Sequence, residues 1–183
     1  MDIGKGSSKG VLSTAGGQIL GRHTVPHGIS VPHPGWVEQD ADEVWWHDFC
    51  EIARALLSGP YRPQDVAGVA VSTSGPCLLL DRSGRPLRPG ILCGVDTRGT
   101  PEIPGMEAAC GAQALYTHSG MALTSQAVSL KVRWLQRHGP DLWAQTAMLT
   151  TASSHVTFRL TGRDEFSAGS VAQAAPIRPV LVC

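Results

Sequence analysis

The chain has 183 residues, of which 42% are hydrophobic, so it is long enough for one domain with its own core. Lys and Arg total 15 and Asp and Glu total 15, and the resulting net charge of zero argues against nucleic-acid binding and against a basic membrane-binding patch. The 21 glycines and 13 prolines indicate many turns.

Cysteine spacing and hydropathy favour a cytoplasmic location. The five cysteines are odd in number and no two have C-x-x-C spacing, so reduced thiols fit better than a disulfide framework or a zinc site. No window approaches the length of about eighteen apolar residues that a membrane span needs. The first residues also lack the charged and then apolar pattern of a secretory signal.

The first forty residues predict a hairpin followed by an irregular loop. Residues 4–8 are small, and residues 18–25 alternate loosely after the turn signal at 15–17, which is typical of a β-hairpin. Residues 26–39 contain three prolines and two glycines and therefore predict a loop without regular structure.

A helix is predicted over residues 41–57. Asp40 is suited to cap its first turn, and Glu43 stands three residues later, as a capping box requires. Apolar residues recur at helical spacing along one face, and Ser58–Gly59–Pro60 ends the pattern; the apolar positions are Trp45, Phe49, Ile52 and Leu56.

The remaining segments predict strands mixed with helices. Residues 66–72 are almost all apolar, which indicates a buried central strand, and residues 78–80 are followed by a turn at 81–84. Helices are expected over residues 125–137 and 152–160, the second ended by Gly162. This order favours an α/β or α+β class with a mixed sheet.

The stretch from Asp2 to Lys9, DIGKGSSK, is the best candidate for a ligand site. Its small residues allow a ligand to approach the backbone, and successive N–H groups and hydroxyls form an anion-binding concavity. Lys9 is suited to phosphate, and Asp2 to a hydrated magnesium ion. The stretch lacks the Walker A spacing, and the same residues also fit a hairpin turn that binds nothing.

Four segments together resemble a known family. The pattern D-x-G-x-x-S-x-K between two strands resembles the first phosphate loop of the actin-like ATPase superfamily. PGWVEQD with the following VWW resembles a segment of the FGGY carbohydrate kinases, as do ILCGVDTR at residues 91–98 and LTGR at residues 160–163. The order and spacing match the N-terminal domain of a xylulokinase-like member, over residues 2–177.

The resemblance implies an α/β, ribonuclease H-like (actin-like ATPase) fold with a mixed central sheet flanked by helices. Residues 1–177 would form the N-terminal domain with a shortened first strand, and residues 178–183 a divergent tail. Family members transfer phosphate from Mg-ATP to a sugar or polyol hydroxyl in the cleft between two domains.

The resemblance also assigns roles to individual residues. Asp2 would face magnesium through water, and the phosphate-binding residues would be Gly4, Gly6, Ser7, Ser8 and Lys9. The sugar-binding residues would be Ser74, Gly75 and Asp96. Lys5 stands where the family usually has Thr. No catalytic residue is assigned, because the catalytic Asp of the family corresponds to a position beyond residue 183.

The absence of that base and of the nucleotide-binding second domain predicts weak or no activity for this chain alone, since a general base contributes about 10²–10⁴-fold. Two alternatives are a non-catalytic sugar-binding module and an actin-fold interaction protein. An uncovered inter-domain face would also favour self-association.

Aromatic and titratable side chains add further expectations. Trp45 is expected in the core and Trp36 at the wall of a ligand site. Cys77 and Cys93 are expected to behave as small buried apolar residues. The three histidines of the N-terminal region fit no metal motif and are expected to be solvated loop residues; they are His23, His27 and His33.

Overall fold

The computed structural model describes residues 1–163, which form a mixed α/β arrangement. The strands are β1 (Asp2–Ile3), β2 (Ser7–Ser13), β3 (Ile19–Pro26), β4 (Glu38–Gln39), β5 (Ser72–Thr73), β6 (Leu78–Leu80), β7 (Gly90–Ile91) and β8 (Met148–Thr150). The helices are η1 (Ala41–Trp46), α1 (His47–Leu56), η2 (Pro63–Asp65), η3 (Thr100–Glu102), α2 (Ile103–Cys110), α3 (Ala112–Ser119), α4 (Val128–His138), α5 (Pro140–Gln145) and α6 (Ala152–Thr161). The predicted domain boundary at 177 and the tail 178–183 lie outside the described residues.

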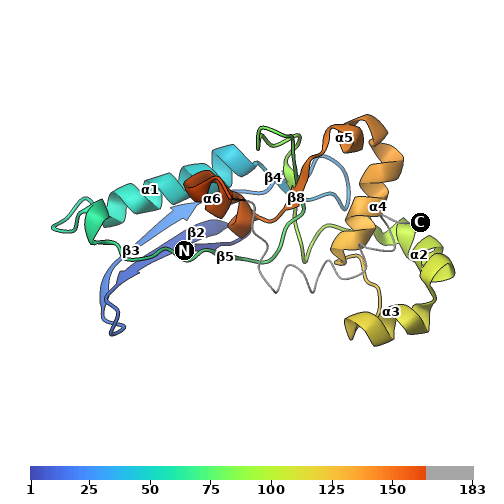
Figure 1. Cartoon of the computed structure of the whole chain (residues 1–183), viewed down its shortest axis with the longest axis horizontal. Helices are drawn as coiled ribbons and strands as arrows, with labels where there is room; N and C mark the ends of the chain where they lie inside the picture. The colour runs from blue at the N-terminus through green and yellow to red at the C-terminus, as the bar shows by residue number, and fades with distance from the viewer. Residues whose placement is uncertain (164–183) are drawn as a thin grey trace.

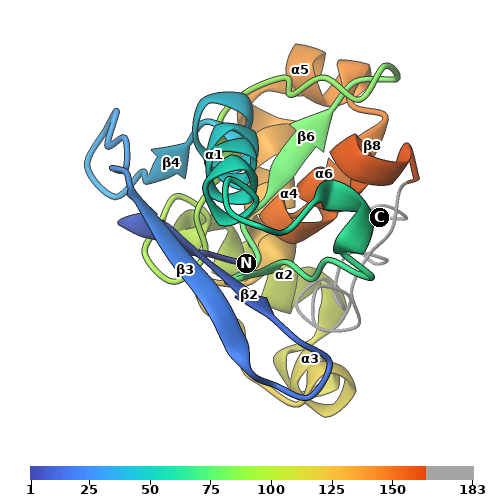
Figure 2. The same ribbon diagram turned by 90° about the vertical axis from the view of Figure 1, so that its left-hand side faces the viewer.

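The main sheet has four strands in the order β3-β2-β1-β5 and is mixed, as predicted. β1 pairs antiparallel with β2 and parallel with β5. β2 and β3 form the predicted hairpin, with Ser7 opposite Pro26 at its open end. Figure 1 shows α1 lying along this hairpin, with α2 to α5 gathered at the other end of the molecule, and Figure 2 views the molecule from the hairpin side.

The helix predicted over residues 41–57 is confirmed. Asp40 Oδ1 accepts hydrogen bonds from the backbone N–H groups of Asp42 and Glu43, both at 2.9 Å. The first turns, η1, are π-helical and continue directly into α1. Gly10 lets β2 approach this helix closely, because a Cβ atom at Gly10 would lie 2.2 Å from Ile52 Cγ2.

The prediction of a buried central strand over residues 66–72 is wrong. Only Ser72 and Thr73 join the sheet, as β5, and Val69 is 58% exposed. The ladder starts at Met1, whose amino group donates to Ala70 O at 2.8 Å. Residues 66–69 precede that point and pair with no strand of residues 1–163, so an apolar run alone does not make them part of the sheet.

Strand β6 separates two hydrophobic cores. It pairs antiparallel with β8, and its three leucines are all fully buried. Because side chains alternate across a strand, Leu79 belongs to one core and Leu78 and Leu80 to the other. The first core includes Ile91, Met106, Leu130, Val132 and Leu135, and the second includes Ile3, Trp45, Leu92, Ala152 and Val156.

The helices of the second half agree with the sequence in part. α4 and α6 correspond to the two predicted helices, and Gly162, with φ of 69°, ends α6. Helices α2 and α3 were not predicted, because the stretch contains Pro and Gly; Gly111, with φ of 80°, separates them. Among residues 1–163, no helix combines the length and the apolarity that crossing a bilayer requires.

Burial confirms the expectations for Trp45 and Cys77. Trp45 is fully buried in the second core and Cys77 in the first. Burial raises the pKa of the Cys77 thiol to about 11, so the group is neutral and packs as a small apolar side chain. Cys93 is only half-buried.

Replacing Gly90 with Ala is expected to destabilise the fold by about 1–3 kcal/mol, the usual cost of overpacking. A Cβ atom there would lie 2.2 Å from Trp45 Cη2, inside the core. Gly28→Ala is the matched control, because no atom lies within 4 Å of its Cβ position, and it is expected to stay within about 0.5 kcal/mol. Urea denaturation measures both values, and equal stability of the two variants would contradict the packing described here.

Because His155 is buried, the free energy of unfolding is expected to fall below about pH 6.5. Burial lowers its pKa, an effect that Asp42, 3.7 Å away, offsets only in part and that Arg159 adds to. The folded state therefore holds a neutral ring while the unfolded chain takes up a proton near pH ~6.5, so stability is full above that pH and falls below it.

The measurement is the free energy of unfolding between pH 7.5 and 5.5 in the wild type and in His155→Gln, with the exposed His118→Gln as the control. His155→Gln is expected to flatten the profile by up to about 1.4 kcal/mol per pH unit, the value for one proton. An unchanged slope would rule out a neutral buried His155.

Candidate active site

The predicted phosphate loop and the first predicted sugar-binding residues lie at the same end of the sheet, at the carboxyl ends of two parallel strands. β1 and β5 are parallel neighbours, with Ile3 opposite Thr73, so Gly4 and Ser74 follow the carboxyl ends of adjacent strands. Open α/β sheets bind their ligands at the carboxyl ends of the parallel strands. Ser74 is exposed, and Gly75 has φ of 72°, a left-handed conformation that glycine adopts without strain.

The alternation of β2 divides the predicted phosphate-binding residues between two faces. Asp2 lies directly opposite Lys9 on β2 and Ser72 on β5, and all three are exposed. Ser7 belongs to the same face as Lys9. Ser8 points to the opposite face and is fully buried, and its hydroxyl has no hydrogen-bond partner within residues 1–163. The strand period thus places the Ser8 side chain inside the protein, and phosphate binding by Ser8 stays a prediction for its backbone alone.

Residues 4–7 form a tight turn with open space above it. Gly4 N donates to Ser7 O at 3.1 Å, and a Cβ atom on Gly4 would lie 2.9 Å from that oxygen. No atom lies within 4 Å of the Cβ position of Gly6. Lys5 and Gly6 are exposed. The turn therefore offers its backbone to a ligand without obstruction by side chains.

The side-chain carboxamide of Gln39 forms hydrogen bonds with the carbonyl groups of this turn on its buried side. Its Nε2 donates to Lys5 O at 3.0 Å and to Gly28 O at 3.2 Å, with a longer contact to Gly4 O at 3.4 Å. Its Oε1 accepts from Trp45 Nε1 at 3.0 Å. Gln39 is 3% exposed, so the buried carbonyls of the loop are paired within the protein.

His27 is the second support of the turn, and the prediction that it is a solvated loop residue is wrong. Its Nδ1 lies 2.6 Å from Asp48 Oδ2 and its Nε2 lies 3.0 Å from Gly4 O, and both side chains are more than 90% buried. Both ring nitrogens therefore face oxygen atoms of the protein. His33 is an exposed loop residue, as predicted, whereas His23 lies in strand β3 and is half-exposed, with Nε2 3.5 Å from Glu51 Oε1.

Asp96 is placed inside the protein rather than at the surface. It is fully buried, and Oδ2 accepts from Val37 N and from Arg98 Nη2, both at 2.7 Å. Oδ1 accepts from Arg98 N at 3.1 Å, and Arg98 Nε contacts both oxygens. The carboxylate is thus occupied by the protein in this structure, and its predicted contact with sugar hydroxyls is not supported by the geometry.

The guanidinium of Arg98 joins this carboxylate to an aromatic cluster. Arg98 Nη1 lies 2.8 Å from Glu38 Oε1, which also pairs with Arg88. Arg98 Cζ lies 4.5 Å from the Trp36 ring centroid and 5.3 Å from that of Trp134. The sequence predicted Trp36 at the wall of a ligand site. In the structure its ring packs against the buried guanidinium of Arg98 instead.

Lys5 connects the phosphate loop to the segment before Asp96. A Cβ atom on Gly94 would lie 3.2 Å from Lys5 Nζ, so the exposed ammonium sits beside that glycine. Gly94 N donates to the side chain of Gln126, which holds the segment against the start of α4. The structure thus brings the predicted phosphate loop and the segment 93–98 together.

The exposed edge has the groups that phosphate and a hydrated metal ion require. Lys5 and Lys9 supply positive charge, and Asp2 is an exposed carboxylate on the same face as Lys9. In the part of the chain that the structure describes, no three His, Cys, Asp or Glu side chains gather as metal ligands. A magnesium ion, which keeps several waters and binds through one or two carboxylates plus phosphates, fits a single carboxylate such as Asp2.

Replacing His27 with Ala is expected to destabilise the chain by about 1–3 kcal/mol, because Asp48 Oδ2 and Gly4 O lose this buried partner and only His47 Nδ1, 3.5 Å from Asp48 Oδ1, stays near the carboxylate. It should also speed hydrogen exchange at the amides of Lys5 and Gly6, since Gly4 O loses its donor. His23→Ala is the control, because His23 is half-exposed and lies 3.5 Å from Glu51. Denaturation and hydrogen exchange check both effects, and identical behaviour of the two variants would disprove the support.

Comparison with known proteins identifies relatives of the whole described region. Residues 1–174 match the model of the FGGY family of carbohydrate kinases, N-terminal domain. A glycerol kinase from a Nostoc species is 26% identical over 165 residues, and the xylulose kinase of Escherichia coli is 30% identical over 164 residues. Each alignment covers 88% of this chain and 33% of the relative, so the chain spans about a third of these proteins.

Solved structures agree with the predicted fold class. The crystal structure of xylulose kinase from Rhodospirillum rubrum superposes with a TM-score of 0.84 and 26% identity, over 94% of this chain and 35% of that one. Glycerol kinase of Plasmodium falciparum, solved with ADP, has a TM-score of 0.74 at 16% identity and supports the fold alone. The ribonuclease H-like, actin-like ATPase architecture is therefore confirmed, and the chain belongs to the FGGY family of carbohydrate kinases, as an N-terminal domain.

Proposed function

We propose that this chain supplies the sugar-binding and phosphate-facing half of a carbohydrate kinase that transfers phosphate from Mg-ATP to a hydroxyl of a xylulose-like sugar or polyol. The observation that carries the proposal is the shared sheet edge, where the turn 4–7 and Ser74 leave adjacent parallel strands. The relatives that cover the region are named as xylulose and glycerol kinases.

In this proposal the residues of the edge divide the work of binding. The backbone of Gly4 and Gly6, the hydroxyl of Ser7 and the ammonium of Lys9 face the phosphates of ATP. Asp2 orients a hydrated magnesium ion, which neutralises phosphate charge when bound. The Ser8 side chain is buried and contributes only its backbone.

Ser74 and the backbone of Gly75 are proposed to contact the sugar. Asp96 acts indirectly, because its carboxylate fixes the segment 93–98 through Arg98 and Val37. Lys5, beside Gly94, lies between the phosphate loop and this segment. A cation in that position would stabilise the negative charge on the transferred phosphoryl group.

The proposal places the chain in the cytoplasm and treats residues 1–177 as one domain. The cysteines of the described region are free thiols; they are Cys50, Cys77, Cys93 and Cys110. Self-association through the face where a second domain would pack remains a prediction. Because the chain spans a third of its relatives, its own turnover is expected to be weak.

Titration of the chain with Mg-ATP, D-xylulose and glycerol tests the proposal. Sugar binding is expected, together with weak Mg-ATP binding that Lys9→Ala reduces about tenfold; Arg82→Ala, an exposed cation in the turn 81–84, is the control and should have no effect. Sugar binding without nucleotide binding would instead identify a sugar-binding module. Failure to bind either ligand, or turnover at about 1–100 s⁻¹, would contradict the proposal.

A further inference from the structure

Cys93 is a half-buried thiol close to the proposed sugar-binding residues. Cys77 and Ile91 form an antiparallel bridge and exchange two backbone hydrogen bonds, both at 2.9 Å. Two residues beyond this bridge, the two segments reach Gly75 and Cys93, so both residues stand at the same end of it. The proposed binding of sugar, phosphate and magnesium makes no use of the thiol.

A buried ammonium group stands beside this thiol. Lys131 is 1% exposed, and within residues 1–163 its Nζ makes one hydrogen bond, to Ser125 O at 3.0 Å. An ammonium group has three N–H donors, so two of them have no protein acceptor in that part of the chain. Cys93 Sγ lies 3.9 Å from Gln126 O, the next carbonyl along the chain. The two side chains therefore converge on neighbouring peptide groups just before α4.

The electrostatic effects on Lys131 point to the same pair. Burial lowers the pKa of Lys131, and of the charged groups around it Cys93 opposes this effect most, ahead of Asp96 and Cys77, whereas Arg98 adds to it. The Asp96 carboxylate is already paired with Arg98, with Nη2 and Oδ2 2.7 Å apart. The buried ammonium would therefore be stabilised most by negative charge on the Cys93 sulfur.

Lys5 adds a second cation on the exposed side of this thiol. Its Nζ lies 3.2 Å from the position that a Cβ atom on Gly94 would take, and Gly94 follows Cys93 directly. Both residues are exposed, so a reagent that reaches the thiol passes the Lys5 ammonium. Partly exposed cysteines in electropositive surroundings are the reactive ones in proteins.

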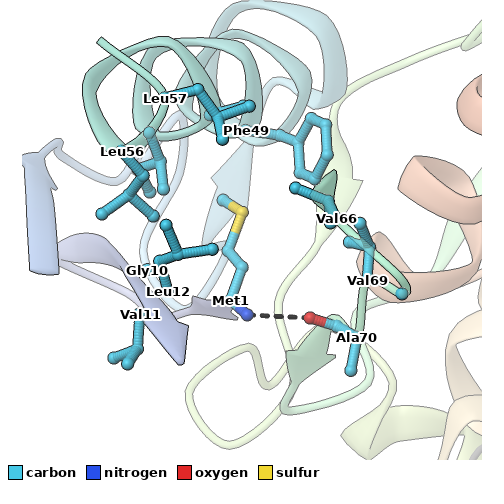
Figure 3. A pocket seen from close by; sticks show the side chains of 13 residues that line it. Met1, Gly10, Val11, Leu12, Phe49, Leu56, Leu57, Val66, Val69 and Ala70 are labelled. Atoms are coloured by element: carbon cyan, nitrogen blue, oxygen red, sulfur yellow. Dashed lines mark hydrogen bonds between the residues drawn. The ribbon is translucent and has the colours of Figure 1, made fainter. Parts of the chain in front are cut away.

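The other described cysteines differ from Cys93 in their surroundings more than in their exposure. Cys50, on α1, and Cys110, at the end of α2, are also half-buried. Cys50 stands beside an acidic residue, Glu51, and Cys110 Sγ lies 4.0 Å from a thioether sulfur. The open apolar groove between α1 and β2, shown in Figure 3, has no cysteine among its described lining residues, so a reagent that enters it meets no thiol.

We propose that Cys93 is a modification site, at which a small disulfide that carries carboxylates forms a mixed disulfide and thereby blocks sugar binding. The Cys93 sulfur attacks one sulfur of the disulfide, so a new S–S bond forms and the original S–S bond breaks. The departing half leaves as a thiolate and takes up, through water, the proton that the Cys93 thiol releases. The Cys93 sulfur is oxidised and the departing half is reduced. The blockage rests on the proposed function, whereas the modification itself does not.

Rates of modification at individual cysteines test the site. The full chain is treated with glutathione disulfide in the absence of sugar and nucleotide, and mass spectrometry of its peptides gives the rate at each cysteine. Cys93 is expected to react about tenfold faster than Cys50 and Cys110, because only its surroundings are proposed to be electropositive. Equal rates at the three sites, or faster reaction at Cys50 or Cys110, would overturn the proposal.

Two variants test the electrostatic cause. Lys131→Met removes the buried ammonium and Lys5→Ala the exposed one, and each is expected to slow modification of Cys93 about three- to tenfold without changing the rate at Cys50. Arg82→Ala, which removes an exposed cation of the turn 81–84, is the control and should change neither rate. Lys5→Ala decides the question if Lys131→Met fails to fold, and an unchanged Cys93 rate in the folded variants contradicts the proposal.

Sugar binding tests the consequence of the modification. Saturation with D-xylulose is expected to protect Cys93, and treatment with glutathione disulfide is expected to weaken sugar binding about tenfold or more in the wild type and in Cys50→Ser. Cys93→Ser should bind sugar equally before and after treatment. Full sugar affinity in a chain modified at Cys93 would disprove the blockage. If the untreated chain binds no sugar, the proposed function fails, and the rates at individual cysteines still decide whether Cys93 is the modification site.

Discussion

The geometry of the site depends on the pairing of two buried carbonyl groups beneath the phosphate loop. A turn as tight as residues 4–7 can pack against the protein only if its buried carbonyl oxygens find donors there. Gln39 and His27 are those donors, and Trp45 and Asp48 fix them in turn. The loop is thus held by a buried polar network whose members come from a strand, a hairpin and the first helix.

A second network holds the segment that faces this loop. Asp96 and Arg98 are fully buried and pair with each other, and Glu38 and the indole rings of Trp36 and Trp134 complete the surroundings of the guanidinium. A buried ion pair adds little net stability, but breaking it is costly, so its effect is to fix one conformation. The segment 93–98 is positioned in this way for Gly94 to lie beside Lys5.

The sequence predicted the elements that depend on local signals and missed those that depend on register. The cap at Asp40, the stripe of α1 and the glycine at the end of α6 are local, and all three were correct. The strand predicted over residues 66–72 does not form as predicted, because only Ser72 and Thr73 lie beside β1 and pair with it. His27 and Asp48 are 21 residues apart, and only the hairpin brings them together, so nothing near His27 in the sequence marked it as buried. Likewise, the motif around Asp96 suggested a sugar-binding carboxylate, and nothing in that motif shows that Arg98 and Val37 N occupy its oxygens.

The placement of β6 has a consequence for how the molecule comes apart. Leu79 contributes to one hydrophobic core and Leu78 and Leu80 to the other, so a single three-residue strand is a wall of both. If β6 unfolds, both hydrophobic cores lose buried leucine side chains and become exposed to water. The hairpin end and the helical end of the described region are therefore energetically joined, and they lose their structure in one cooperative event instead of melting as separate units.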